Sequence, residues 1–446
     1  MNILIVGAGD IGFHLAKRLS VERHNTMIVD HDSLLVKRAA EQLDALVIEG
    51  HGASYHSLSQ AQIHDADILA AMTNKDEVNI LACQIGKKVG VPVTIARVRN
   101  PEFTDPDYIL NKEDLGIDLI IHPEKETANA IIRLVKRSEA TDVIEFAGGK
   151  CQMLGIRLET NSPVLGTPLK ELAKIYAEIP QRVVAINRLQ RTIIPGGETI
   201  LKDGDQIFVV CDSQYIPQLM DITGKNETRV NDIMILGGGL VGQFIAGTLS
   251  KDYSIKIIES NAARSEAIAN ILHNSLIIHG DGTDIDLLAS EGLMEMDVFA
   301  AVTGDDETNI ISTLVARHLK VPRTIALVNN VDYLPITPTI GMDAVVSKQL
   351  ITVNEVQRFI RHQMVASITS LPEIDAEIIE FQVNSQSKII RKALKDVRFP
   401  DSAIVGAILR EDKFILPTGE TQFHPGDTVV VFTLPDARAD VEKLFH

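Results

Sequence analysis

The chain of 446 residues contains an internal repeat, and this repeat limits the possible folds more than any other feature of its sequence. The segment Asn2–Gly12 is an apolar run followed by closely spaced glycines, and Asp232–Gly242 repeats this pattern 230 residues later. The same separation relates five further pairs: Gly50 and Gly280, Asp67 and Asp297, Thr73 and Thr303, Asn79 and Asn309, and Pro92 and Pro322. A separation kept over so much of the chain predicts a duplicated domain.

A weaker repeat follows each copy of the first. Ile144–Phe146 resembles Ile379–Phe381, and Gly204-Asp205 resembles Gly426-Asp427. The separation falls from 235 to 222 residues between these pairs, which predicts a shorter second copy. We therefore expect four domains with a polar, glycine-containing linker at residues 224–228. The expected domains are residues 1–138, 139–224, 230–366 and 367–446.

The first domain of each half has the pattern of a doubly wound α/β fold, in which short apolar strands alternate with amphipathic helices. The expected strands of the first copy are Ile3–Val6, Thr26–Val29, Ala45–Ile48, Ile68–Met72, Val93–Ala96 and Asp118–Ile121. The expected helices include Ile11–Leu19, Glu77–Val89 and Pro123–Arg137. The sequence therefore predicts two Rossmann-like domains, each built on a parallel sheet.

The second domain of each half has short alternating runs broken by glycine and proline turns. In the first copy these runs are Val143–Phe146, Val183–Asn187 and Gln206–Val210, with one helix at Leu169–Tyr176. Such a pattern is typical of a small α+β domain with an antiparallel sheet. Glu145, Glu380, Asp205 and Asp427 are interpreted as edge-strand and turn residues rather than catalytic groups.

Composition excludes several classes of function. The chain carries 60 acidic and 43 basic residues, a net charge of −17, which disfavours nucleic acid and bare anionic membrane as partners. No run approaches the roughly 20 apolar residues of a membrane-spanning helix, and the N-terminus lacks the basic start of a signal peptide. The three cysteines are scattered, as expected in a reducing cytosol, and no metal-ligand pattern is present. The acidic clusters near Asp142, Asp305 and Asp436 are interpreted as solvated charge rather than cation sites.

Each half contains a complete dinucleotide-binding fingerprint, with glycines between a strand and a helix and an acid at the end of the next strand. In the first copy, Gly7 allows the tight turn, Gly9 lets a pyrophosphate approach the backbone, and Gly12 lets helix and strand pack closely. The carboxylates of Asp30 and Glu259 are expected to accept hydrogen bonds from ribose hydroxyls, which favours NAD, ATP or ADP over NADP. The expected loop and helix-start residues are Gly7, Ala8, Gly9, Asp10, Ile11, Gly12, Gly237, Gly238, Gly239, Leu240, Val241 and Gly242.

Other binding residues are expected at the carboxyl ends of the parallel strands, where ligands of such folds bind. In the first half these are His51 and Gly52, Thr73 and Asn74, and Arg97 and Arg99. In the second half they are Asp281, Gly282, Thr303 and Gly304, whereas Leu327 and Asn329 replace the two arginines. Two arginines can neutralise phosphate groups, so the first site is expected to suit a charged polyphosphate better than the second.

The sequence favours a regulatory protein over an enzyme. A dehydrogenase needs a second domain with a catalytic acid or base, and the small domains show no such constellation. Two alternatives stay open at this point. They are an NAD-dependent oxidoreductase of unknown substrate, and a nucleotide-sensing regulator of another ion transporter, such as an antiporter.

The order of domains resembles the TrkA family, the cytosolic subunits of bacterial Trk potassium uptake systems, whose halves resemble RCK domains (regulators of potassium conductance). The motifs that carry the resemblance are Ile5–Gly12, Asp30, Glu49–Gly52, Ala71–Thr73, Ala96–Arg99, Gly237–Gly239, Glu259, His279–Thr283 and Ala301–Asn309. His51 departs from the family pattern, because many RCK copies have an acid at its position, whereas Asp281 keeps the acid.

The resemblance implies a non-enzymatic gating subunit that binds NAD(H) and ATP or ADP. It also implies a homotetrameric ring on the inner face of the cell membrane, held there by a TrkH- or TrkG-like potassium transporter. On this view the chain is cytoplasmic and does not itself insert into the membrane.

Overall fold

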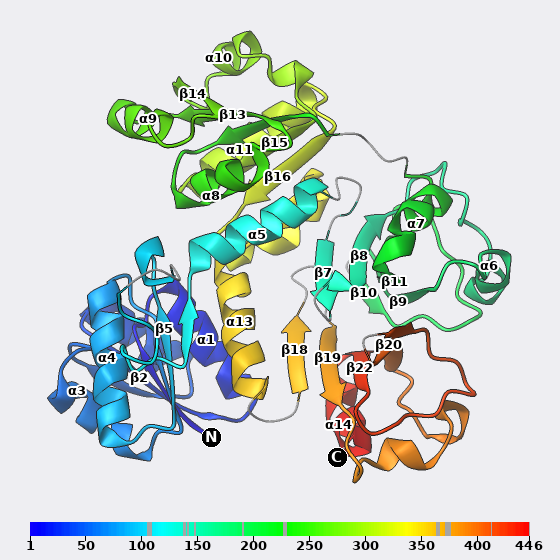
Figure 1. The fold of residues 1–446 in the computed structure, drawn as a ribbon, viewed down its shortest axis with the longest axis horizontal. Coiled ribbons are helices and arrows are strands. Elements are labelled where there is room, and N and C mark those ends of the chain that lie inside the picture. The colour runs from blue at the N-terminus through cyan, green and yellow to red at the C-terminus, as the bar shows by residue number, and fades with distance from the viewer. Residues whose placement is uncertain are drawn as a thin grey trace. The chain divides into compact units, whose positions relative to one another are not determined.

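The computed structural model describes residues 1–104, 109–136, 140, 142–146, 149–189, 191–225, 230–362, 366–370, 376–411 and 413–445 (Figure 1). Contacts divide the chain into two compact units. The first unit is Met1–Thr127 together with Ser347–Phe359, and the second is Ala128–Val346 together with Ile360–His446. Of the expected linker, residues 226–228 lie outside the described residues, as do the expected helix end at 137 and the boundary residues 138 and 139.

The first six strands form one parallel sheet in the order β3-β2-β1-β4-β5-β6, which is the order of a Rossmann-like domain. The strands are β1 (Asn2–Val6), β2 (Asn25–Asp30), β3 (Leu46–Glu49), β4 (Ile68–Ala71), β5 (Val93–Arg97) and β6 (Leu119–Ile121). The helices are α1 (Asp10–Val21), α2 (Ser33–Gln42), α3 (Tyr55–Gln60), α4 (Asp76–Val89) and α5 (Pro123–Lys136). The order of the strands reverses between β1 and β4, which is the point where ligands bind in folds of this kind.

A second parallel sheet repeats this topology in the order β14-β13-β12-β15-β16-β17. Its strands are β12 (Asp232–Leu236), β13 (Ser254–Glu259), β14 (Ser275–His279), β15 (Val298–Ala301), β16 (Arg323–Leu327) and β17 (Ala344–Val346). Its helices are α8 (Leu240–Leu249), α9 (Ala262–Ala269), α10 (Ile285–Ser290), α11 (Asp306–His318), α12 (Thr337–Ile340) and α13 (Lys348–His362). The expected duplicated α/β fold is confirmed.

The central strands are buried on both faces, which explains why their sequences are almost continuously apolar. Ile3, Leu4 and Ile5 of β1 are fully buried. The helices that flank them begin at side-chain caps in several places; for example, Asp32 accepts the backbone N–H of Leu34 at the start of α2 (2.9 Å). Gly90 ends α4 in the left-handed conformation that glycine adopts without strain.

Helix α13 belongs by its contacts to the first Rossmann-like domain, although it follows the last strand of the second. Gln357 on α13 donates a hydrogen bond to Glu22, the residue that follows α1 (2.6 Å). Figure 1 shows the two helices alongside each other. The later part of α5, from Ala128, groups with the second unit.

Each small domain contains a five-stranded sheet whose strand pairs are antiparallel, as expected. The first sheet has the order β10-β9-β11-β8-β7 and the second has the order β18-β19-β22-β20-β21. The first domain comprises β7 (Asp142–Phe146), β8 (Cys151–Arg157), α6 (Leu169–Ile175), β9 (Gln181–Arg188), β10 (Arg191–Ile193), β11 (Gln206–Asp212) and α7 (Ile216–Thr223). The second comprises β18 (Ala366–Ser370), β19 (Glu377–Gln382), β20 (Ala403–Arg410), β21 (Lys413–Ile415), β22 (Thr428–Thr433) and α14 (Arg438–Phe445).

These two sheets correct one sequence-based pairing. Ile379–Phe381 lies on β19, which pairs with β18 and β22, whereas Ile144–Phe146 lies on β7, which pairs only with β8 among the named strands. The counterpart of β19 is therefore β8, and the counterpart of β7 is β18. The expected match was displaced by one strand because the same tripeptide, Ile-Glu-Phe, occurs on β7 in the first half and on β19 in the second. Strand β8 and helix α7 were not expected from the sequence.

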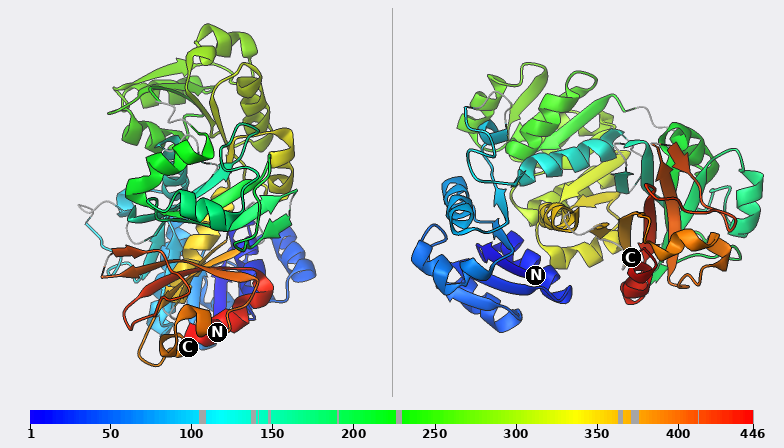
Figure 2. Two further views of the ribbon diagram at one scale, coloured as in Figure 1. Left: turned by 90° about the vertical axis from the view of Figure 1, so that its right-hand side faces the viewer. Right: turned by 60° about the horizontal axis from the view of Figure 1, so that its bottom comes forward.

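The two small domains share a hydrophobic core, and β9 contacts β20 (Figure 2). Phe208 from one sheet and Phe432 from the other are fully buried in this core. Arg182 crosses the contact, where its guanidinium donates hydrogen bonds to the carbonyl oxygens of Val405 (3.1 Å) and Pro417. The two small domains are therefore packed together rather than independent.

The aspartates that follow the last turn of each small sheet have structural partners. Asp205 accepts two hydrogen bonds from Arg188, from Nε (2.7 Å) and Nη2 (2.6 Å). Asp427 accepts the equivalent pair from Arg410 (2.8 and 2.9 Å). These contacts agree with the interpretation of both residues as turn residues. Within the described ranges, no helix is both long enough and apolar enough to span a bilayer.

Candidate nucleotide-binding sites

Four glycines of the two fingerprints are required by the fold itself. Gly7 and Gly237 have φ angles of +106° and +112°, which side chains rarely adopt. A Cβ added to Gly12 would lie 1.9 Å from the carbonyl oxygen of Gly7, and one added to Gly242 would lie 2.1 Å from that of Gly237. Each loop therefore packs directly onto the first turn of the following helix.

Gly9 and Gly239 have no such structural reason to be glycine. Both precede a helix with ordinary extended backbone angles, at φ −64° and −68°. A Cβ added at either position would meet no atom within 4 Å. Neither strain nor packing explains the absence of a side chain here. In the dinucleotide-binding fingerprint, glycine at this position lets a pyrophosphate approach the backbone at the N-terminus of a helix.

The expected acidic residues lie beside these loops. Asp30 is buried, and its Oδ2 accepts the backbone N–H of Ala8 (2.6 Å) while its Oδ1 accepts that of Asp32 (2.9 Å). Glu259 repeats the arrangement, because its Oε2 accepts the N–H of Gly238 (3.0 Å) and its Oε1 that of Asn261 (2.7 Å). Each carboxylate thus ties the glycine-rich loop to the end of the next strand.

Glu259 also has a cationic partner that the sequence did not reveal. Arg264 on α9 approaches Glu259 Oε2 at 3.2 Å. Burial alone would raise the pKa of Glu259, but the N–H groups of Asn261 and Gly238 together with Arg264 hold this pKa below its usual range. The corresponding contact in the first half comes from His31, whose Nδ1 lies 3.1 Å from Asp30 Oδ1.

The residues after the fourth strand of each sheet are held by a buried asparagine. Asn79 Oδ1 accepts hydrogen bonds from the backbone N–H (3.0 Å) and hydroxyl (2.7 Å) of Thr73, and its Nδ2 donates to the carbonyl oxygens of Thr73 and Arg97. Asn309 makes the same four contacts with Thr303 and Leu327. From the sequence, the two asparagines are only a pair that marks the repeat, and no pattern predicts their structural role. Asn74 and Gly304, the next residues along, are exposed at this edge.

The turn after the third strand packs against the fingerprint strand. A Cβ on Gly52 would lie 2.2 Å from Val6, and one on Gly282 would lie 1.9 Å from Leu236. The residue before each glycine is exposed, and the two differ in chemistry. His51 Nδ1 accepts the N–H of Ala53 (3.2 Å), whereas Asp281 accepts the backbone N–H (2.9 Å) and hydroxyl (2.8 Å) of Thr283, which lower its pKa.

The residues at the ends of the fifth strands, β5 and β16, differ most between the two Rossmann-like domains. In the first half, Arg97 ends β5 and Arg99 donates from Nε to Glu124 (3.2 Å). Burial lowers the pKa of Arg97, and the charges of Glu124 and of Asp10 in the fingerprint helix partly restore it. In the second half, Asn329 Nδ2 donates to Asp306 (3.1 Å). The first site therefore has positive charge near its loop where the second has neutral groups.

Across the described part of the chain, no three His, Cys, Asp or Glu side chains are placed to hold a metal ion. The three cysteines are buried, and burial raises the pKa of each, to about 12 for Cys211, so their thiols are protonated at neutral pH.

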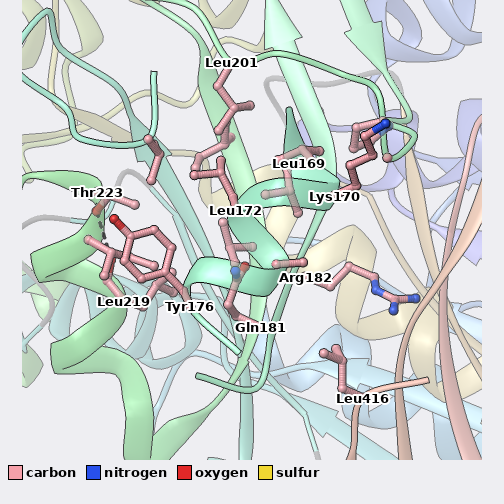
Figure 3. Close-up of a pocket in the computed structure, with 18 of the residues that line it drawn as sticks. Leu169, Lys170, Leu172, Tyr176, Gln181, Arg182, Leu201, Leu219, Thr223 and Leu416 are labelled. Carbon is pink, nitrogen blue, oxygen red and sulfur yellow. Dashed lines mark hydrogen bonds between the residues drawn. The ribbon is translucent and has the colours of Figure 1, made fainter. Parts of the chain in front are cut away.

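A cavity of about 340 Å³ lies in the first small domain (Figure 3). Its walls are mostly apolar and come from α6, α7 and the sheet, with Leu172, Tyr176 and Leu219 among them. Arg182 also borders it, with the guanidinium engaged by the two carbonyl oxygens described above. None of the expected nucleotide-binding residues lines this cavity.

Comparison with known proteins decides the family. The TrkA-N domain model matches residues 3–123 and 233–348, and the TrkA-C domain model matches residues 153–224 and 378–446. The Trk system potassium uptake protein TrkA homolog 2 of Methanosarcina mazei is 35% identical over 454 residues, covering 100% of both chains. The chain belongs to the TrkA family. Another relative, the Trk system potassium uptake protein TrkA of Azorhizobium caulinodans, is 33% identical over 100% of this chain and 99% of its own.

Solved structures agree with this TrkA-family fold. The crystal structure of the GsuK RCK domain superposes with a TM-score of 0.63 at 18% identity, covering 100% of this chain and 94% of that one. The GsuK channel bound to NAD gives a TM-score of 0.63 at 18% identity, covering 100% of this chain and 78% of that one. At this level of identity the similarity shows that the TrkA-family chain has an RCK fold.

Proposed function

We propose that this chain is a regulatory subunit that binds NAD(H) and adenine nucleotides at two sites and thereby controls potassium uptake by a membrane transporter. The observation that carries the proposal is the pair Gly9 and Gly239, whose missing side chains neither packing nor backbone strain requires. Each lies in a loop tied to a buried acid that can also accept ribose hydroxyls. Relatives named as Trk potassium uptake proteins and an RCK channel described as bound to NAD support the assignment.

We propose as binding residues the loop, acid and strand-end residues predicted from the sequence in both halves. The ribose would lie at Asp30 or Glu259 and the pyrophosphate at Gly9 or Gly239. Additional phosphate groups would lie toward Arg97 and Arg99 in the first half. We also propose the division into domains at residues 1–138, 139–224, 230–366 and 367–446.

The regulatory action requires no chemical step. A ligand shifts an equilibrium only by its difference in affinity between two states. We propose that four chains form a ring on the cytoplasmic side of a TrkH- or TrkG-like transporter. Nucleotides would bind two shapes of that ring with different affinity, and the ring would transmit this preference to the pore.

The direct test is calorimetric titration of the full-length protein with ATP, ADP, NAD and NADH. Gly9→Asp and Gly239→Asp place a negative charge where the pyrophosphate would lie, in space that accepts a side chain, so folding should survive. Each variant should remove one of two binding events. Gly196→Asp, which also falls in open space but in a small domain, is the matched control and should bind like the native protein. Absence of binding to the native protein, or unchanged binding in both variants, would refute the proposal.

The link to potassium requires a second experiment. Cells lacking this gene should grow poorly when potassium is limiting, and the native gene should restore growth. A gene carrying both Gly9→Asp and Gly239→Asp should alter the response of potassium uptake to nucleotide supply. Equal uptake with and without the gene would exclude the transport role while leaving nucleotide binding intact.

A further inference from the structure

A buried carboxylate beside the carboxyl end of β5 lies close to several cationic side chains. Glu124, in the first turn of α5, has a side chain only 5% exposed. Its Oε1 lies 3.2 Å from Arg99 Nε and 3.7 Å from Lys348 Nζ. Arg97 is close enough for the charge of Glu124 to act on it. Three cations therefore surround one buried acid.

Other acidic groups also lie near these cations, since the charges of Asp76 and Asp10 act on Arg97. Both oxygens of Asp76 accept the backbone N–H of Arg99 (3.0 Å each), and one also accepts the N–H of Asn100. His122 Nδ1 lies 3.7 Å from Glu124 Oε2 and accepts the backbone N–H of Lys125 (3.3 Å), and burial lowers the pKa of His122. The Nε of Arg97 is buried and has no hydrogen-bond partner within the described residues. A buried guanidinium N–H without an acceptor is costly unless a ligand supplies one.

Lys348 comes from the second half of the sequence. It is the first residue of α13, the helix whose contacts group it with the first Rossmann-like domain. Burial lowers the pKa of Lys348, Glu124 opposes this effect, and Arg97 and Arg99 repel its charge. No local pattern in the sequence predicts a role for Lys348, because it is more than 200 positions from Glu124 and the two arginines.

The second half has no equivalent cluster. Strands β6 and β17 are equivalent and end at Ile121 and Val346. Counting from these ends, the second half has Gln349 where the first has Glu124. In the same way, the first half has Pro123 where the second has Lys348. Leu327 and Asn329 replace the arginines. The first site therefore has Glu124 together with Arg97, Arg99 and Lys348, and the equivalent positions of the second site carry none of these charges.

We propose that Lys348 is a phosphate-binding residue of the first nucleotide site, where it acts with Arg97 and Arg99 on the terminal phosphate groups of a nucleoside polyphosphate. This inference rests on the nucleotide-binding function proposed above. Without nucleotide, Glu124 occupies Arg99 and Lys348. With nucleotide, the phosphate charge replaces Glu124 as their partner. The first site therefore favours ATP over AMP, and its occupancy acts directly on the start of α13.

The test compares ATP and AMP affinities by calorimetry in full-length protein carrying Gly239→Asp, which leaves only the first site. Lys348→Met should weaken ATP binding about tenfold and AMP binding little, since a charge-assisted hydrogen bond is lost only with the terminal phosphates. Lys348→Arg keeps the charge and should restore most of the ATP preference. Lys251→Met, which removes an exposed lysine, is the control for general charge loss.

Two further variants make the result decisive. Glu124→Gln removes the competing acid and should strengthen ATP binding. In protein carrying Gly9→Asp, where only the second site remains, Lys348→Met should leave all affinities unchanged. If the native protein binds ATP but Lys348→Met has the same ratio of ATP to AMP affinity, the role of Lys348 is refuted and the nucleotide function stands. If the native protein binds no nucleotide, both fail together.

Discussion

The two Rossmann-like domains keep the same framework and differ in the charges around it. Gly7 and Gly237 share their left-handed backbone, and Asn79 and Asn309 make the same four hydrogen bonds. In contrast, the arginines at the end of β5 have no counterpart after β16. Steric needs within each domain therefore constrain the framework residues, whereas the residues at the strand ends differ in charge between the two halves.

One difference shows how the two loops reach the same geometry with different residues. The first half combines Ala8 with Asp30, and the second combines Gly238 with Glu259. A Cβ on Gly238 would lie 2.5 Å from Ile268 and 3.1 Å from Glu259 Oε2. The second half therefore has no room for a methyl group at position 238 beside Glu259 and Ile268. Both pairs nevertheless keep the hydrogen bond between the carboxylate and the loop.

The largest expected effect tests the shared framework. Gly12→Ala and Gly242→Ala place a Cβ 1.9 and 2.1 Å from a carbonyl oxygen of the preceding loop, which cannot move without displacing the first strand. Each should lower the free energy of unfolding of its domain by about 3 kcal/mol, as measured by denaturant unfolding. Gly239→Ala, in open space, is the control. A loss in one half only would show that the two frameworks are not equivalent.

The next effect tests the buried asparagines. Asn79→Ala and Asn309→Ala each remove four hydrogen bonds and leave buried backbone groups without partners. Unfolding measurements should show a loss of about 2 kcal/mol in each case. Asn74→Ala, one residue beyond the held threonine and exposed, should change stability little. A negligible loss for Asn79→Ala would mean that water or a shifted turn replaces these contacts.

A smaller effect separates the two ligand sites. Arg97→Ala should weaken ATP binding at the first site about tenfold while weakening ADP binding less, because the guanidinium lies toward the additional phosphate. Leu327→Ala, at the matching position of the second half, should leave the ATP-to-ADP affinity ratio unchanged. Titration calorimetry in the single-site variants measures both. If Arg97→Ala leaves both the ATP affinity and the ADP affinity unchanged, Arg97 does not contribute to phosphate binding.

The smallest effect is a pH dependence that arises from Glu259 in the second half. Glu259 has its pKa lowered in the folded state, so its ionised form stabilises the fold above the pKa of an unfolded glutamate. This contribution to stability should be lost as the pH falls from about 4.5 through the pKa of Glu259 in the folded protein. Because solvent screens the charge, the loss should be less than about 1 kcal/mol. Acid unfolding of Glu259→Gln should lack this component. An identical acid profile for native and variant protein would contradict it.

Local patterns in the sequence were enough to predict the strands of the first Rossmann-like domain, the fingerprints and the acids, because these depend on residues close together along the chain. Strand β8 was missed, and the pairing of Ile144–Phe146 with Ile379–Phe381 was wrong because three matching residues do not identify which strand carries them. Arg264, Glu124 and Lys348 were not predicted as parts of the sites. Their positions depend on tertiary packing of helices whose sequences show only an amphipathic pattern.

The grouping of α13 with the first Rossmann-like domain has a consequence during synthesis. Residues Met1–Thr127 leave the ribosome early, but the unit they form also includes Ser347–Phe359. At typical elongation rates of about 5–20 residues per second, the last part of that unit emerges roughly 10 to 50 seconds after the first. The N-terminal domain must therefore wait, incompletely assembled, until most of the chain has been translated.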